Sequence, residues 1–175
     1  MRSWAYLALL FNALVWGLSW LPLRHLQEAG LHPVWATMLF FALGALMIGL
    51  WRPSVVRAVL GQPALLVLAL VSGVSNATFN WGVATGDVVR VVLLFYLMPL
   101  WAALLARVML NEQITRAAWW RMGLALSGAI LVLKPEGQAW PQFGSLSDVL
   151  GLLGGMGFAM TNVMLRQQSQ QPAVS

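Results

Sequence analysis

The feature that most constrains the fold of this chain is the stretch 88–115, VVRVVLLFYLMPLWAALLARVMLNEQIT. Its apolar part, residues 88–110, has a proline at the middle and an arginine near each end, and the polar loop NEQIT follows it. An apolar run of this length is sufficient for an α-helix to cross a bilayer. In a water-soluble protein the same run would need a large core around it, so we predict a membrane-spanning helix.

The composition extends this conclusion to the whole chain. Hydrophobic residues make up 60% of the 175 residues, charged residues make up 9%, and the mean hydropathy is +0.77. Because ordinary globular domains carry about 25% charge, this chain lacks the surface of a water-soluble enzyme. The formal net charge of +5 comes from basic residues scattered singly between apolar runs, which fits membrane loops and argues against a nucleic-acid partner. The sequence contains no cysteine, which excludes disulfides and thiolate metal sites.

Six segments reach or approach the length of a membrane span, and short loops with glycine and proline separate them. The first is longer than the apolar region of a secretory signal peptide, so we interpret it as a retained signal-anchor helix. We predict an all-α, polytopic membrane protein with a bundle of about six transmembrane helices. The predicted spans are residues 4–23, 33–51, 63–84, 88–110, 117–133 and 149–165.

Basic residues in the loops predict the orientation, since cytoplasmic loops are enriched in arginine and lysine. With the N-terminus in the cytoplasm, seven basic residues fall on the inside and three on the outside. We therefore expect a multi-pass protein of the cell (inner) membrane with a cytoplasmic N-terminus. The inside set is Arg2, Arg52, Arg57, Arg107, Arg116, Arg121 and Arg166, and the outside set is Arg24, Arg90 and Lys134.

A weak internal repeat relates the first predicted span to the last. The second copy starts five helices after the first and therefore crosses in the opposite direction, as in the inverted-topology repeats of transporters. Chance similarity between two apolar helices is the alternative. An offset of 142 residues aligns Leu10 with Leu152, Trp16 with Phe158, Ser19 with Thr161, and Arg24 with Arg166.

Several segments are similar to one transporter family. They are WGLSW (16–20), YLMPLWAALLARVMLNEQIT (96–115), GLALSGAILVL (123–133) and GSLSDVLGLLGGMGFAMTNVMLRQ (144–167). With its proline-centred fourth span and the acidic loop after it, the chain resembles EamA-type members of the drug/metabolite transporter superfamily. The resemblance implies a transporter, not an enzyme, that exports a small-molecule substrate such as an amino acid across the lipid bilayer by alternating access.

The same resemblance implies three parts of the chain. Residues 1–134 correspond to the first five-helix repeat, residues 135–147 to an extracytoplasmic loop, and residues 148–175 to the first helix of a partial, inverted second repeat with a polar tail. Because members usually carry two complete five-helix repeats, we expect either a truncated chain or a homodimer or partner chain that supplies the missing repeat. A truncated or non-transporting membrane subunit is therefore the alternative function.

Polar and aromatic residues within the spans are candidates for substrate contacts. In the first span they share one helix face, and in the third span two asparagines lie one turn apart. Such faces suit a cavity for a flat or amphiphilic metabolite, but the same groups can instead hydrogen-bond to neighbouring helices. The predicted substrate-binding residues are Asn12, Trp16, Ser19, Trp20, Asn76, Asn80, Arg90, Tyr96, Pro99, Thr161 and Asn162.

Two residues of the fourth span have specific predicted roles. Arg90 lies three residues after Asp87. It is either an anion-attracting group at the outer mouth of the pathway, tuned by Asp87, or an interfacial arginine beside a helix-capping aspartate. Pro99 removes a backbone hydrogen bond and clashes with the carbonyl of Phe95, which predicts a kink in mid-helix. That kink either takes part in transport or is static.

The remaining polar residues favour structural roles. Glu112 lies among arginines at the cytoplasmic edge, which favours a salt bridge, and Thr115 is a predicted N-cap. No aspartate or glutamate lies in the apolar middle of a predicted span, so proton coupling through a buried carboxylate is poorly supported. His25 and His32 are too few for a metal site, and we expect no cofactor.

Overall fold

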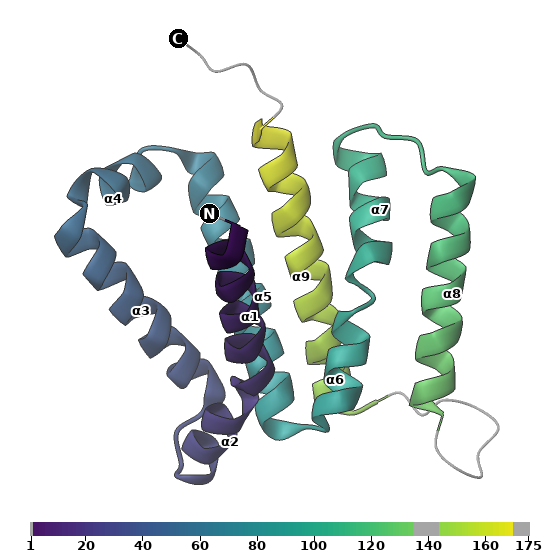
Figure 1. Cartoon of the computed structure of the whole chain (residues 1–175), viewed down its shortest axis with the longest axis horizontal. Coiled ribbons are helices and arrows are strands. Elements are labelled where there is room, and N and C mark those ends of the chain that lie inside the picture. Colours follow the sequence, from purple (N-terminus) through teal and green to yellow (C-terminus); the bar gives the residue numbers. More distant parts are fainter. Residues whose placement is uncertain (1, 135–143, 170–175) are drawn as a thin grey trace.

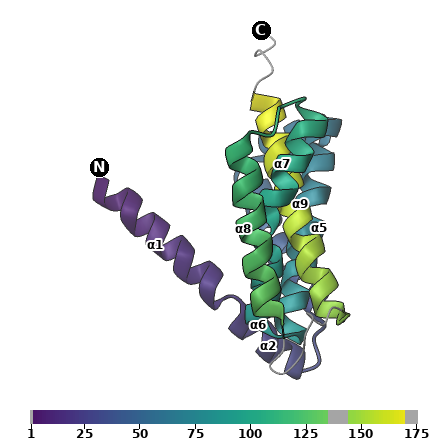
Figure 2. The same cartoon turned by 90° about the vertical axis from the view of Figure 1, so that its right-hand side faces the viewer.

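The structure, a computed structural model, describes residues 2–134 and 144–169. Within these ranges the regular elements are α-helices, and no strand is present. Apart from the first helix, the long helices stand side by side, with short helices at the two ends of the bundle (Figures 1 and 2). The helices are α1 (Arg2–Leu18), α2 (Trp20–Glu28), α3 (Pro33–Trp51), α4 (Pro53–Leu60), α5 (Pro63–Thr85), α6 (Val88–Phe95), α7 (Met98–Met109), α8 (Arg116–Leu133) and α9 (Leu146–Ser169).

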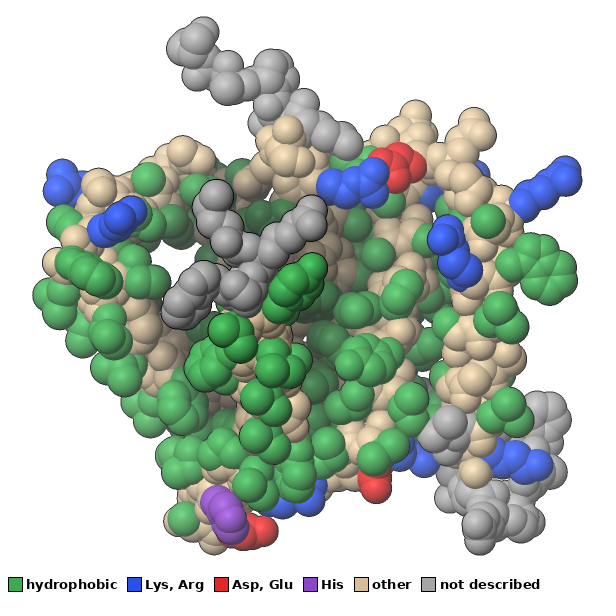
Figure 3. All heavy atoms as spheres, viewed as in Figure 1, with side chains coloured by type: hydrophobic (Ala, Val, Ile, Leu, Met, Phe, Trp, Pro, Cys, Tyr) green, Lys and Arg blue, Asp and Glu red, His purple; other side chains and the backbone are tan. Residues whose placement is uncertain are grey.

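The described helices supply the predicted membrane spans. The fifth predicted span, 117–133, forms α8 beside α7. It is not among the five stretches given below, because Arg116 and Arg121 lower the hydropathy of its first half. Charged side chains gather mainly at the two ends of the molecule, and a broad apolar band separates them (Figure 3). The chain is an all-α polytopic membrane protein, as predicted. Five stretches are long and apolar enough to cross a membrane, namely Tyr6–Glu28, Pro33–Trp51, Pro63–Thr85, Val88–Met109 and Leu146–Ser169.

Two of these stretches are each divided into two helices, four residues before a proline. α1 ends at Leu18 and Pro22 lies in α2, whereas α6 ends at Phe95 and Pro99 lies in the first turn of α7. A proline has no N–H to donate to the carbonyl four residues earlier, and its ring collides with that carbonyl in a continuous helix. The two breaks therefore have the same physical cause.

The disruption predicted at Pro99 takes the form of a short break, because the helix stops at Phe95 and restarts at Met98 within one membrane-spanning stretch. The Leu97 amide donates to the carbonyl of Leu94 (3.2 Å) in a tight turn, and Pro99 then occupies a position where the missing N–H would have no partner anyway. The predicted span 4–23 is also divided into two helices, at a break caused by Pro22. The prediction did not take this proline into account. At that break the Ser19 hydroxyl donates to the carbonyl of Trp16 (2.9 Å), a local bond that competes with the helix.

The first break lets α1 leave the bundle. In Figure 2, α1 runs obliquely away from the other helices, while α2 stays at the end of the bundle. Arg24 holds α2 in place by donating to the carbonyls of Val83 (3.2 Å), Ala84 (3.4 Å) and Gly86 (2.7 Å) at the end of α5. The last carbonyls of a helix have no partner within the helix, so one side chain satisfies them and joins α2 to α5.

Close contacts through glycine hold α9 between α5 and α7 (Figure 1). A Cβ atom on Gly151 would lie 2.9 Å from the carbonyl oxygen of Val91, and one on Gly155 would lie 2.5 Å from the carbonyl oxygen of Phe95. Small residues let helix backbones approach closely, and this packing is a main source of helix association in a bilayer. The glycines therefore fix α9 against the backbone of α6.

Replacing Gly155 by alanine should destabilise the bundle, because the new methyl group would collide with the backbone of Phe95. We expect the free energy of unfolding, measured by SDS titration of the micelle-bound protein, to fall by about 1–3 kcal/mol. Gly123→Ala on α8 is the matched control, since a Cβ atom there has nothing within 4 Å, and it should be neutral or slightly stabilising. Equal effects of the two substitutions would contradict this packing.

Candidate functional site

A cavity of about 530 Å³ lies between the first span, α5, the junction of α6 and α7, and α9. Its volume is typical of small-molecule binding sites. Apart from Ser19, its lining consists of glycine, aliphatic and aromatic residues. We call it the aromatic cavity after the six rings in its wall, which belong to Trp16, Trp20, Phe79, Phe95, Tyr96 and Phe158.

Both helix breaks border the aromatic cavity. Gly17 and Ser19 flank the end of α1, and Phe95, Tyr96 and Met98 flank the gap between α6 and α7; all five line the cavity. Substrate sites of secondary transporters are commonly formed by discontinuous helices of this kind. The break between α1 and α2 and the break between α6 and α7 therefore lie at the same cavity, although they are far apart in the sequence.

Neighbouring rings, tilted relative to one another, form one wall of the aromatic cavity, with Phe95 at their centre. The ring centroid of Phe95 lies 4.6 Å from that of Phe79, 5.5 Å from that of Phe158 and 6.3 Å from that of Tyr96. The ring planes are inclined by 53–58°, an arrangement that brings the positive edge of one ring toward the negative face of another. The cluster thus joins α5, α6 and α9 at the break.

A second hollow of about 750 Å³, which we call the lateral groove, lies between the first span, α3 and α5. Its lining is almost wholly apolar apart from Ser19, Thr37 and two asparagines. Asn80 donates to the hydroxyl of Thr37 (3.1 Å) and so links α5 to α3, whereas Asn76 donates to the carbonyl of Ser72 (2.9 Å) in its own helix. These amides serve helix packing as well as lining the groove.

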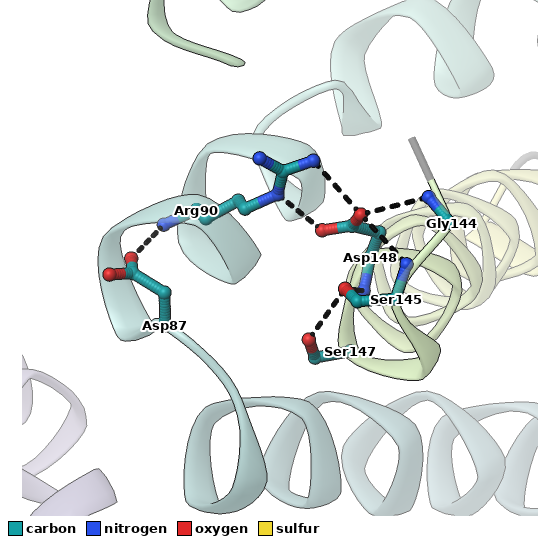
Figure 4. A network of polar contacts seen from close by, with 6 residues as sticks. All are labelled: Asp87, Arg90, Gly144, Ser145, Ser147 and Asp148. Carbon is teal, nitrogen blue, oxygen red and sulfur yellow. Dashed lines mark hydrogen bonds and ion pairs between the residues drawn. The ribbon is translucent and has the colours of Figure 1, made fainter. Parts of the chain in front are cut away.

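Arg90 and Asp148 form an ion pair where α6 and α9 begin (Figure 4). Nε of Arg90 lies 2.5 Å from Oδ1 of Asp148, and Nη2 lies 3.0 Å from Oδ2. Oδ2 also accepts from the backbone amides of Gly144 and Ser145 (3.3 Å each), and the Ser145 hydroxyl accepts from the Asp148 amide (3.2 Å). This reciprocal capping satisfies the N-terminus of α9. The Asp148 side chain is 1% exposed, so its charge is buried among these partners.

Asp87 is the cap of α6, as the structural alternative expects. Its carboxylate accepts from the backbone amide of Arg90 (2.8 Å), while the guanidinium group of Arg90 points to Asp148 on α9 (Figure 4). Val88 and Val92, which share a face of α6, line the aromatic cavity, and Arg90 does not. The main charged partner of Arg90 is therefore Asp148 on another helix, while Asp87 lies next to it as the cap of α6.

Comparison with known proteins identifies the family. Residues 3–134 match the EamA-like transporter family. The chain belongs to this family. Two similar curated proteins are named pseudopaline exporter CntI and come from Pseudomonas aeruginosa strains UCBPP-PA14 and PAO1. Each is 28% identical to the chain over 138 residues, which cover 77% of this chain and 48% of the relative. The chain thus spans about half the length of these relatives, and no solved structure matches it.

In this EamA-like chain, six of the predicted substrate residues line one or both hollows. Trp20 and Tyr96 line the aromatic cavity, and Asn76 and Asn80 line the lateral groove. Trp16 and Ser19 border both. Three residues predicted in the first span thus line a hollow of the structure, and their role in binding stays a prediction.

The other five predicted residues line neither hollow, and they are Asn12, Arg90, Pro99, Thr161 and Asn162. The hydroxyl of Thr161 donates to the carbonyl of Gly157 (3.0 Å), and the amide of Asn162 donates to the carbonyl of Phe158 (2.9 Å). Both side chains therefore bond one turn back within α9. Asn12 lies on the exposed part of α1.

The acidic loop after α7 connects to α9. Oε1 of Glu112 lies 2.6 Å from Nη2 of Arg166, so the predicted salt bridge exists with an arginine of α9 as its partner. Thr115 caps α8 by accepting from the Ala118 amide (3.2 Å), which confirms the predicted N-cap. Within residues 2–134 and 144–169 no group of three histidine, cysteine, aspartate or glutamate residues is arranged for a metal ion.

Sequence reasoning missed the residues that come from distant parts of the chain. Phe79 and Phe158 are ordinary apolar residues of a membrane helix until the fold brings them to Phe95. Asp148 did carry a local signal, because Ser145 three residues earlier completes a capping pattern. Its pairing with Arg90 depends on the contact between α6 and α9, and the sequence pattern does not show that these two helices are neighbours.

Asp148→Ala should destabilise the protein strongly, because it leaves Arg90 without this partner and removes a cap of α9. We expect the free energy of unfolding in detergent micelles to fall by about 3 kcal/mol, the combined effect of a broken buried ion pair and a lost cap. Asp87→Ala is the matched control, since it removes only a cap, at a cost of about 1 kcal/mol. If Asp148→Ala costs no more than Asp87→Ala, the ion pair does not stabilise the junction of α6 and α9.

Proposed function

We propose that this chain forms part of an exporter that moves a small metabolite, such as an amino acid, through the aromatic cavity by alternating access. The observation that carries the proposal is that both proline breaks border this one cavity. Membership of a transporter family and similarity to proteins named as exporters support the same function.

Movement would occur at the two breaks, around a rigid centre. Glycine contacts and the Arg90–Asp148 pair tie α9 to α6, whereas α1 beyond its break stands away from the bundle (Figure 2). Pro99 and Pro22 act as hinges, and Arg90 acts by positioning α6 against α9. Asn12, Thr161 and Asn162 are further candidate contacts on the route to and from the cavity.

A second half completes the pathway in this proposal. The chain covers 48% of the length of its exporter relatives, and its aromatic cavity is walled by the first span, α5, α6–α7 and α9. In this proposal the facing wall comes from residues outside the sequence described, in the same chain, in another copy or in a partner chain. The alternative function is a non-transporting membrane subunit that pairs with another chain.

The proposed orientation has the N-terminus in the cytoplasm. Because the sequence contains no cysteine, single cysteines report their own exposure without background. We expect Glu28→Cys to react with a membrane-impermeant maleimide in intact cells, and Gln113→Cys to react after the membrane is opened. The reverse pattern would contradict the orientation that the loop charges predict.

Gly17→Phe should block export by filling the aromatic cavity. Gly17 lines this cavity, and a Cβ atom there has nothing within 4 Å, so the larger side chain enters the cavity without a backbone collision. We expect the export rate to fall by about tenfold or more, equivalent to about 1.4 kcal/mol of lost interaction. Gly128→Phe on α8 is the control, because it is equally open but lies away from the cavity.

The measurement is mass spectrometry of metabolites released by cells that produce the chain, alone and together with a second-repeat chain. A metabolite released faster than from empty-vector cells, and retained again with Gly17→Phe, supports the proposal. If no metabolite is released above background in either setting, or if Gly128→Phe has the same effect as Gly17→Phe, the proposed function is wrong.

A further inference from the structure

The wall of the aromatic cavity is rich in aromatic rings as well as being apolar. Six of its thirteen described lining residues carry aromatic rings, against four of the fourteen that line the other apolar hollow, the lateral groove. Phe95 holds its ring next to those of Phe79, Phe158 and Tyr96. Rings fixed in this way present both faces and edges, the two surfaces with which another ring interacts favourably.

The polar groups of the cavity limit what else can bind there. The Ser19 hydroxyl donates to the carbonyl of Trp16, and among the described residues that line the cavity none has a charged side chain. The two nearby arginines lie outside the lining: Arg24 binds carbonyls at the end of α5 and packs 5.3 Å from the centroid of the Trp20 ring, and Arg90 binds Asp148. A charged group buried in this cavity would have no opposite charge to pair with, which is costly. An uncharged flat ring has no such cost.

We propose that the aromatic cavity binds an uncharged aromatic ring of the transported compound, which stacks against Phe95 and Phe158 beside the α6–α7 break. The part of this inference that concerns a transported compound rests on the proposed function. The volume of about 530 Å³ accommodates a two-ring group. Any charged or strongly polar part of the compound lies outside the cavity, toward the solvent.

The test compares two uncharged probes of the same carbon skeleton, 2-naphthylmethanol and its fully saturated decalin analogue. Binding of each is measured at equilibrium to the full chain in lipid nanodiscs, with empty nanodiscs subtracted for partition into lipid. We expect the aromatic probe to bind about threefold to tenfold more tightly than the saturated one, the ratio that ring–ring contacts supply.

Two variants assign that preference to the cavity. Phe95→Leu and Phe158→Leu keep an apolar side chain but remove a ring, so each should reduce the preference toward one. Phe158 is partly exposed (36%), so its replacement leaves the bundle folded even if Phe95→Leu weakens it. Phe41→Leu, in the lateral groove on α3, is the control and should keep the full preference.

Equal affinity for the two probes in the unmodified chain would overturn the inference, because a plain apolar hollow filled by lipid chains predicts that result. Loss of the preference with Phe41→Leu would overturn it as well. The result of this test can be distinguished from that of the export test. If the chain prefers the aromatic probe but exports no metabolite, the binding site is supported and the proposed transport function is wrong. If the chain exports a metabolite but shows no preference for the aromatic probe, only the proposed binding site is wrong.

Discussion

Close packing of α9 against α5 and α6 is the interaction on which the rest of this structure depends. Lipid tails are as apolar as leucine, so helices in a bilayer associate where backbones can approach or polar groups can bond. α9 does both: Gly151 and Gly155 admit the backbone of α6, and the Ser75 hydroxyl of α5 donates to the carbonyl of Gly154 (2.7 Å). The peripheral helices α1, α3 and α8 instead expose many large apolar side chains, as a lipid-facing surface requires.

This fixed centre gives the two proline breaks their significance. The carbonyl of Phe95, which Pro99 deprives of its helical donor, lies against Gly155 of α9. The same break therefore faces the aromatic cavity, and its freed carbonyl lies at one of the closest contacts between helices. α9 has no proline and runs unbroken from Leu146 to Ser169. Since α9 is continuous and the two neighbouring spans are each divided, bending of the bundle can be confined to the two proline breaks.

The sequence alone predicted the fold class, the family and most span boundaries, because apolar length, proline and loop charge are local properties. It also led to Trp16, Ser19 and Trp20 as one wall of the aromatic cavity, since their helical spacing is local too. It did not predict that Pro22 divides the first span, although the rule applied to Pro99 holds there as well. The Phe95 ring cluster depends on which helices touch, and no spacing along the chain encodes that.

The central claim is that the aromatic cavity is a route for solute within the membrane, and the reactivity of single cysteines tests it most directly. The measurement is the rate at which a small, uncharged, water-soluble methanethiosulfonate reagent modifies Val92→Cys, in the cavity wall, and Leu124→Cys, on the exposed face of α8. The account predicts rapid modification at position 92 and slow modification at position 124 in reconstituted bilayers. Equally slow modification at both positions would mean that lipid, not a solute pathway, occupies the cavity.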